Sequence, residues 1–453
     1  MKINAAPKKD RFEYMTQTPV PKLITTLAVP TIISMLVTGI YNTADTFFVG
    51  RISTQATAAV GLVFSVMAII QALGFFCGHG SGNYLSRMLG GGRTQEANEM
   101  ASTGFALALM IGVVIAAAGL CFQGQIAEMI GATSTTMEDT KSYMSIILLG
   151  APFMIGQFVI NNQLRFQGSA MFAMIGLMCG AVINIVLDPL LIFACHMGVR
   201  GAAIATVSGQ IVSFVVLLIG SMQGENIRLN IHNIHINKHY LFEITNGGIP
   251  SLFRQGLAAI ATLLLNNYAG RLGGDAAIAG MSVVTRVLML LVSALIGFGQ
   301  GYQPVCSFNY GANLKSRVRE GYFFCVKFGT LFLLAVSSVC ILFAPQIVGW
   351  FRDDPQVIAV GTVALRYQAA VLPLMGTTTM TNMMLQSTGK GLKASITASA
   401  RNGIFFIPLI LILPEMFGLF GVEITQSCAD VLAFARAVPL AYSELRHMKE
   451  DGN

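Results

Sequence analysis

SAMFAMIGLMCGAVINIVLDPLLIFA, residues 169–194, contains a single charged residue, Asp188, in a stretch long enough to cross a lipid bilayer. A helix of about 20 apolar residues spans the hydrocarbon core of a membrane. Apolar blocks of this length recur about twelve times along the 453 residues. They lack the regular alternation of polar and apolar residues that the strands of a membrane barrel show. The sequence therefore predicts an all-α integral membrane protein.

The composition supports this class and argues against others. Hydrophobic residues make up 54% of the chain and charged residues 11%, whereas about 25% of the residues of a soluble domain are charged. The eight cysteines are scattered and never spaced as CxxC, so we expect neither a disulfide framework nor a metal site. No pair of nucleophile and base is apparent. We therefore expect a protein that is not an enzyme and that has no catalytic residues, metal or cofactor.

The predicted fold consists of twelve transmembrane helices. Their expected spans are 23–48, 57–82, 100–122, 142–163, 169–194, 199–222, 243–270, 276–300, 322–345, 357–385, 392–415 and 418–442. Lysine and arginine concentrate in the two termini and in the even-numbered loops. Because such residues favour the cytoplasmic side, we predict a multi-pass protein of the plasma (cell inner) membrane with both termini in the cytoplasm.

The two halves of the chain resemble each other. Pro30 and Pro250 each precede a Gly-Arg pair by 20 and 21 residues, and Pro152 and Pro373 each precede a glycine by 16 residues. Repeats of six helices that both begin in the cytoplasm are related by an axis along the membrane normal. Transporters built in this way bind their substrate between the repeats. We therefore predict two pseudo-symmetric lobes of six helices each.

This repeat sets the expected domain boundaries. They are a cytoplasmic N-terminal tail at 1–22, an N-lobe at 23–222, a cytoplasmic linker at 223–242, a C-lobe at 243–442 and a cytoplasmic C-terminal tail at 443–453. The linker contains His232, His235 and His239 at spacings that metal ligands can have. No cysteine or acid cluster accompanies them, so we expect a solvated loop.

Two acids lie deepest in the predicted spans, Asp45 and Asp188. Placing an ionised side chain at this depth costs at least about 2.5–3.5 kcal/mol, so such residues normally line water or contact a partner. Tyr41 and Asn42 lie about one helical turn before Asp45, and Asn184 lies one turn before Asp188. Each acid therefore shares a helix face with a group that forms hydrogen bonds.

The second half of the chain has no acid at the matching positions. Leu265 aligns with Asp45, and Ile407 aligns with Asp188. The scaffold of the repeat therefore does not require the acids. Two interpretations remain open: an ion or substrate site, or buried acids that stay protonated and hydrogen-bonded for helix packing.

Three segments resemble the multidrug and toxic compound extrusion (MATE) transporters. They are TADTFFVGR at 43–51, NIVLDPLLIF at 184–193 with GVRGAAIAT at 198–206, and GFGQGYQPVCSFNYGA at 297–312. The resemblance extends from about Leu27 to Ala441. It implies a secondary active multidrug efflux antiporter that works by alternating access. Such a protein exports amphipathic, often cationic organic compounds in exchange for H⁺ or Na⁺.

The same resemblance implies which residues form the sites. The N-lobe cation or proton site would consist of Asp45, Asn184, Asp188 and Thr206. The substrate cavity would include Tyr41, Asn42, Asn161, Arg286 and Gln300. This chain lacks the acids that some branches of the family carry in the seventh and tenth helices, which argues against coupling through the C-lobe. We expect a monomer that acts on small molecules among membrane lipids, without nucleic acid.

Other charged residues in the spans receive different interpretations. Arg286 lies about ten residues into its span, and a cavity role and a packing ion pair both remain open. Arg254 lies nearer the end of its helix, so we expect it at the membrane interface. Asp430 and Arg436 are six residues apart on one predicted helix, where they could satisfy each other, and we favour a structural role for them.

Other functions are compatible with parts of this pattern. A MATE-like exporter or flippase of one metabolite or lipid-linked substrate would have the same fold. A passive channel is disfavoured, because the repeat predicts one central site and no ring of pore residues is apparent. Counterflow would discriminate, because a channel does not accumulate a drug against its gradient.

Overall fold

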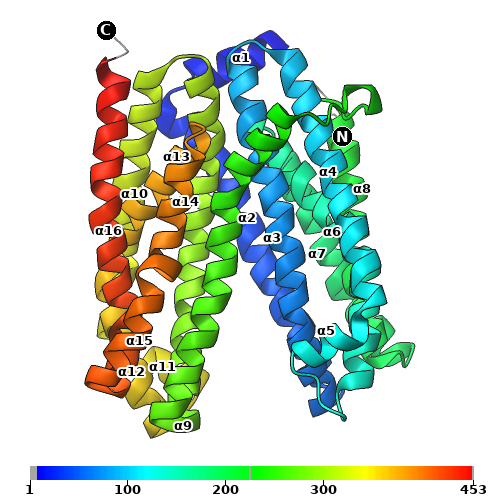
Figure 1. Ribbon diagram of the computed structural model, residues 1–453, viewed down its shortest axis with the longest axis vertical. Coiled ribbons are helices and arrows are strands. Elements are labelled where there is room, and N and C mark those ends of the chain that lie inside the picture. Colours follow the sequence, from blue (N-terminus) through cyan, green and yellow to red (C-terminus); the bar gives the residue numbers. More distant parts are fainter. Residues whose placement is uncertain (1–7, 224–225, 451–453) are drawn as a thin grey trace. The chain divides into compact units, whose positions relative to one another are not determined.

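The computed structural model describes residues 8–223 and 226–450, with the side chains of all of these except residues 8–10, 42, 43, 449 and 450. Every regular element in this part of the chain is a helix (Figure 1). The chain forms two compact units. Unit 1 consists of the described residues up to Thr18 together with Val29–Gly248, and unit 2 consists of Pro19–Ala28 together with the described residues from Ile249 onward.

Unit 1 is built around one central helix, α6. Its elements, including most of α2, are α1 (Lys8–Gln17), α2 (Val20–Gly50), α3 (Thr54–Gly90), α4 (Thr94–Cys121), α5 (Gln123–Met129), α6 (Met137–Phe166), α7 (Ala170–Pro189), the π-helix η1 (Leu190–Ala194), α8 (Gly198–Met222) and the 3₁₀-helix η2 (Ile231–Asn233). Helices α3, α4, α7 and α8 all pack against α6. The most apolar stretch of α6 is 67% buried, a larger share than in the other membrane-length helices of the unit.

Unit 2 contains most of the remaining elements. They are α9 (Lys238–Gly311), α10 (Lys315–Leu342), α11 (Ala344–Phe351), α12 (Pro355–Val371), α13 (Leu374–Ser387), α14 (Gly391–Ser399), the π-helix η3 (Ala400–Ile404), α15 (Phe406–Phe417) and α16 (Leu419–Glu450). Helix α9 is interrupted at Gly274, where φ is 64° and ψ is −158°. Since only glycine readily adopts such a conformation, this residue marks the turn between two membrane crossings.

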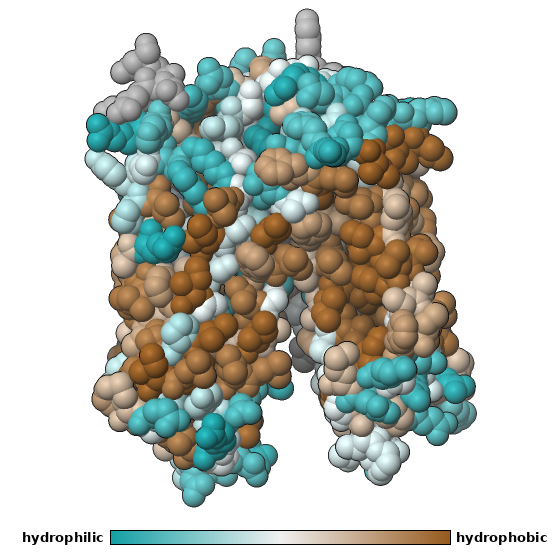
Figure 2. Space-filling model, in the orientation of Figure 1, coloured by the Kyte–Doolittle hydropathy of each residue, from teal (hydrophilic) through white to brown (hydrophobic). Residues whose placement is uncertain are grey.

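The helices account for twelve crossings. Among the described residues, nine helical segments are long and apolar enough to span a membrane, and the bent pair of α12 and α13 makes a tenth. The break in α9 divides its 74 residues into two crossings, and α16 completes the set. In each unit, hydrophobic side chains cover the middle of the visible surface and hydrophilic side chains cover its ends (Figure 2). The predicted twelve-helix membrane fold is confirmed.

The internal repeat is visible in the backbone. Gly168 and Gly389 both end a helix with positive φ, at 83° and 80°. Phe122 and Phe343 both join a long helix to a short one, with φ and ψ of −110° and 21° in the first and −106° and 21° in the second. Both pairs are 221 residues apart. The two six-helix halves therefore fold in the same way at corresponding positions.

The first long helix of each half begins in the other unit. Residues 20–28 of α2 belong to unit 2, and residues 238–248 of α9 belong to unit 1. Glycines permit the close packing of both segments. A Cβ at Gly80 would clash with the backbone of Ile244 in unit 1, and a Cβ at Gly301 would clash with the backbone of Ala28 in unit 2. The unit boundaries therefore lie inside helices.

The N-terminal segment and the linker both pack on unit 1. Arg11 of α1 donates a hydrogen bond to Asn226 Oδ1 at 3.0 Å and one to Ser169 Oγ at 3.3 Å. Part of the predicted tail is thus an ordered helix. In the linker, the backbone N–H of His235 donates to Thr103 Oγ1 at 3.0 Å. The three histidines are exposed, as predicted, although His239 already belongs to α9 rather than to a loop.

Candidate functional site

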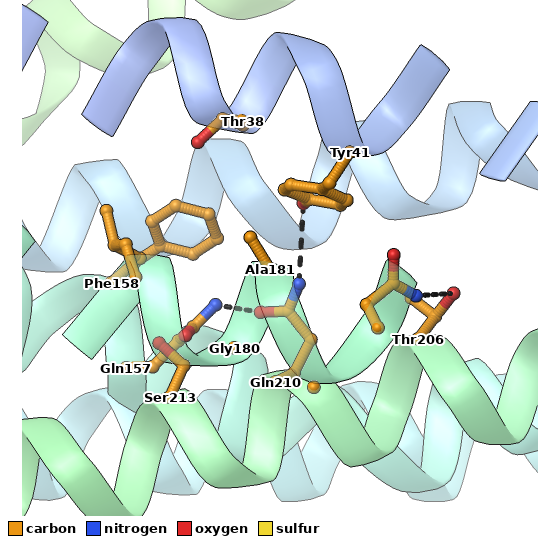
Figure 3. A pocket seen from close by; sticks show the side chains of 12 residues that line it. Thr38, Tyr41, Gln157, Phe158, Gly180, Ala181, Thr206, Gln210 and Ser213 are labelled. Atoms are coloured by element: carbon orange, nitrogen blue, oxygen red, sulfur yellow. Dashed lines mark hydrogen bonds between the residues drawn. The ribbon is translucent and has the colours of Figure 1, made fainter. Parts of the chain in front are cut away.

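A small polar pocket lies inside unit 1 between α2, α6, α7 and α8 (Figure 3). The polar side chains that line it are Thr38 and Tyr41 of α2, Gln157 of α6, Asn184 of α7, and Thr206, Gln210 and Ser213 of α8. Its volume of about 30 Å³ holds two or three water molecules, because each water needs about 10–15 Å³ of such space. The pocket therefore matches the size of an ion or of water rather than of a drug molecule.

Helix spacing and glycines create this pocket. Thr206, Gln210 and Ser213 lie at steps of four and three residues, so α8 presents them on one face. Helices α7 and α8 approach each other closely at Gly180 and Gly209. A Cβ at Gly180 would lie only 2.6 Å from the carbonyl oxygen of Gly209. This contact brings the polar side chains of both helices within hydrogen-bond range.

Two sets of hydrogen bonds connect the polar side chains (Figure 3). Gln157 Nε2 donates to Gln210 Oε1, and Gln210 Nε2 donates to the hydroxyl of Tyr41 at 3.5 Å. Asn184 Nδ2 donates to Thr206 Oγ1 at 3.4 Å. The bond between Asn184 and Thr206 joins two of the residues proposed for the cation site, although they are 22 residues apart in the sequence.

The two acids lie beside these groups with little hydrogen bonding. Asp188 is fully buried, and within the described part of the chain neither of its carboxylate oxygens has a hydrogen-bond partner. Asp45 is half-buried, and its Oδ1 and Asn184 Oδ1 are likewise without a partner there. The two carboxyl groups interact electrostatically with each other. Tyr143, which is fully buried, also interacts electrostatically with both of them.

This arrangement has a clear chemical requirement. Buried polar groups normally form hydrogen bonds, since leaving one unpaired costs about 1–3 kcal/mol or more. Here carboxylate, amide and phenol oxygens converge without enough donors. Protons on the acids would supply donors, and a hard cation would accept the oxygens as ligands. The site therefore suits either H⁺ or a small hard cation.

The backbone changes immediately after Asp188. Pro189 ends α7, and the π-helix η1 follows at once. Proline has no N–H to donate to the carbonyl one turn earlier, which explains why the regular α-helix is interrupted here. Short π-helices are frequent at functional sites. The acid thus sits where the helix is locally irregular.

Asn161 does not line this pocket. Its Nδ2 donates to the carbonyl oxygen of Ala173 at 2.9 Å. In unit 2, Asn382 donates to the carbonyl oxygen of Ala394 at 2.6 Å, and both partners are shifted by 221 residues. Because both halves form the same bond, this amide serves the helix packing of the repeat.

The other predicted cavity residues lie elsewhere. Gln300 and Arg286 belong to the second crossing of α9 in unit 2, where Gln300 is buried and Arg286 is exposed. The side chain of Asn42 is outside the described residues. Tyr41, Asn184 and Thr206 are therefore the predicted residues that the structure brings into the pocket.

Two charged residues of unit 2 lie in surroundings that differ from those expected. Asp430 does not share its surroundings with Arg436, which is exposed. It forms an ion pair with Arg401, with Nε to Oδ1 at 2.6 Å, because η3 packs against α16. Arg254 is not near a helix end. Helix α9 begins at Lys238, earlier than predicted, and places Arg254 sixteen residues from its start.

Sequence reasoning missed five polar residues of the site: Thr38, Tyr143, Gln157, Gln210 and Ser213. The sequence could have identified Gln210, because this residue follows Thr206 by one turn on the predicted helix 199–222. Tyr143 lies in the polar start of α6, and Gln157 is a single polar residue in an apolar stretch of the same helix. No spacing on their own helix relates them to the acids, so only the packing of α6 could identify them.

The chain matches the model of a known protein family. The family model MatE matches the chain over residues 30–190 and 250–412, one match in each half. The chain belongs to the MATE family. The two matches cover Asp45 and Asp188 in the first half and Pro250 to Ile412 in the second, so both halves of the chain match the same family model.

Relatives in the MATE family match nearly the whole chain. Multidrug export protein MepA of Staphylococcus aureus is 30% identical over 438 residues, which is 96% of each protein. MepA of Staphylococcus haemolyticus is 29% identical over 442 residues, again 96% of each. An outward-facing multidrug resistance MATE transporter of the MOP superfamily has a TM-score of 0.90 and 27% identity, with 97% of this chain and 98% of that chain covered. A MATE structure in a bent conformation has a TM-score of 0.91 and 26% identity, with coverages of 99% and 100%.

Proposed function

We propose that this MATE protein is a secondary active multidrug efflux antiporter that exchanges amphipathic, often cationic organic compounds for H⁺ or Na⁺. The relatives named as multidrug export proteins support the substrate class. The observation that carries the coupling role is the convergence of unpaired buried oxygens from Asp45, Asn184 and Asp188 in unit 1.

The coupling follows from electrostatics. Two nearby carboxylates in a poorly solvated site repel each other when both are ionised. A proton on one acid, or a cation between both, removes this repulsion. An organic cation attracted by the same negative charge is then bound less tightly. Since linkage is reciprocal, the ion and the cargo must weaken each other's binding by the same factor. Entry of the ion thus favours release of the cargo.

Two prolines would support the conformational change that alternating access requires. Pro30 and Pro250 each lie just beyond the point where α2 and α9 pass from one unit to the other. Each proline removes one hydrogen bond of its helix and so permits local bending. We expect these positions to act as hinges between two rigid bodies.

Transport in proteoliposomes tests the function. Purified protein would be reconstituted, and uptake of a fluorescent organic cation would be followed with a pH gradient or a Na⁺ gradient imposed alone. We expect one gradient to drive accumulation against the concentration gradient of the cargo. If the cargo only equilibrates under both gradients, the antiport proposal is wrong.

Orientation in the plasma membrane is part of the proposal. The charge distribution of the loops predicts that both termini and the linker face the cytoplasm. A cysteine introduced at Asn233 should react with a membrane-impermeant thiol reagent only after cells are opened. Labelling of intact cells at this position would contradict the orientation.

A further inference from the structure

Unit 2 contains an arginine, Arg254, that no other described side chain neutralises. Its Nη1 is buried and has no hydrogen-bond partner in the described chain, and no ion pair involves it there. It lies sixteen residues after Lys238 in a continuous helix, about 24 Å from the helix start at 1.5 Å per residue. A guanidinium at such a depth in a membrane protein normally faces water, a counter-ion or a ligand.

The packing of α9 shows where Arg254 points. Ser251, Arg254 and Leu257 follow one another at steps of three residues, which places them about 60° apart around the helix. On one side, Ser251 accepts a hydrogen bond from Gln386 of α13 at 2.8 Å. On the other side, Leu257 contacts η3, because a Cβ at Gly403 would lie 2.8 Å from Leu257 Cδ1. Arg254 is therefore directed between α13 and η3.

The surroundings of that position are polar but hold no available acid. Asn382, one turn before Gln386 on α13, and Asn402, next to Gly403, are both buried. On the neighbouring element α16, Asp430 already accepts hydrogen bonds from Arg401 and from Gln426 at 3.0 Å, and the other buried acid of the crossing, Glu423, lies seven residues nearer to the start of the helix. Among the described residues, unit 2 therefore supplies polar side chains near Arg254 but no acid that forms an ion pair with it.

The repeat shows that the scaffold does not need this charge. The residue 220 positions earlier, which matches Arg254 in the alignment of Pro30 with Pro250, is Ser34. Ser34 is buried and donates its hydroxyl hydrogen bond to the carbonyl oxygen of Pro30. A small residue therefore suffices for packing at this position, and the guanidinium in unit 2 requires a separate explanation.

We propose that Arg254 is a specificity-determining residue that binds the anionic group of amphipathic cargo, such as the carboxylate of a zwitterionic drug. The planar guanidinium pairs with a carboxylate through two parallel hydrogen bonds, and such charge-assisted bonds are strongest where water is excluded. This inference rests on the proposed export of organic compounds and names the residue that would bind an anionic group of the cargo.

A matched pair of ligands tests the proposal. Norfloxacin carries a carboxylate, whereas its ethyl ester keeps the amine and lacks the negative charge. Binding of both to the purified full-length protein would be measured by equilibrium dialysis, which needs no ion gradient. In Arg254→Gln we expect norfloxacin affinity to fall about tenfold or more, and ester affinity to stay within about twofold of wild type. Arg254→Lys should restore part of the loss, and Arg436→Gln, an exposed arginine of the same unit, should change neither.

Each other outcome has a definite meaning. Equal loss of norfloxacin and ester binding in Arg254→Gln would indicate a packing role and overturn the proposal, as would unchanged norfloxacin binding. If Arg254→Gln changes only the amount of phosphatidylglycerol that remains bound to the purified protein, the site binds a lipid phosphate and the assignment to cargo is wrong. Failure of ion-driven transport in wild type, with norfloxacin binding still dependent on Arg254, would reject the antiport function and leave this inference standing.

Discussion

Asp188 in unit 1 and Asp430 in unit 2 are both buried acids in membrane-spanning helices, yet they differ in their partners. Asp188 has no hydrogen-bond partner in the described chain. Asp430 is bound by Arg401 and Gln426. An acid in a membrane span is therefore not functional by its position alone. A neutralised acid stabilises the fold, whereas an acid left without partners is available to a proton or cation.

The largest expected effect separates these two acids. Asp188→Asn should reduce ion-driven exchange in proteoliposomes to the background of empty vesicles, because an amide neither takes up a proton nor attracts a cation. The folded fraction of the Asp430→Asn protein should still carry out ion-driven exchange. Exchange by Asp188→Asn at the wild-type rate would contradict the coupling role.

Asp430→Asn should instead act on stability. Removing one partner of a buried ion pair costs about 3 kcal/mol because it leaves the other charge unpaired. We expect a lower thermal midpoint of the purified protein and a lower yield. The double variant Arg401→Gln with Asp430→Asn should regain much of the loss. A normal midpoint for Asp430→Asn, combined with lost exchange, would show that unit 2 shares the chemistry.

A smaller effect concerns the helix segments that belong to the opposite unit. Gly80→Ala would place a Cβ against the backbone of Ile244, and overpacking of this kind costs about 1–3 kcal/mol. Gly61→Ala on the same helix is the matched control, since no atom lies within 4 Å of its added Cβ. The thermal midpoint should fall for the first variant, and the second should be neutral or slightly stabilising. Equal midpoints would contradict close packing at Gly80.

The smallest effect tests the equivalence of the two halves. Asn161→Ala and Asn382→Ala each remove one hydrogen bond to a backbone carbonyl, at a cost of about 1 kcal/mol. We expect similar, modest decreases of the thermal midpoint and unchanged preference between cargoes. A selective change in cargo preference for Asn161→Ala would restore this residue to the substrate cavity.

The sequence by itself determined the membrane class, the twelve helices and the repeat. Apolar blocks decide where helices cross a bilayer, because the cost of placing polar groups in lipid depends on composition rather than on tertiary contacts. Helical spacing also related Asn184 to Asp188, since neighbours within one turn follow from the 3.6-residue period. Residues such as these were predictable from one helix at a time.

Only the tertiary structure decided which helix faces meet. It paired Asp430 with Arg401 rather than with Arg436, added Tyr143 and Gln157 to the acids, and assigned Asn161 to helix packing. It also left Arg254, which lies deep within α9, without an ion-pair partner among the described residues. These features depend on contacts between residues far apart in the chain, and the sequence period of a single helix does not specify them. The physical reason is that helix packing, set here by glycines such as Gly180 and Gly209, selects the partners of every buried polar group.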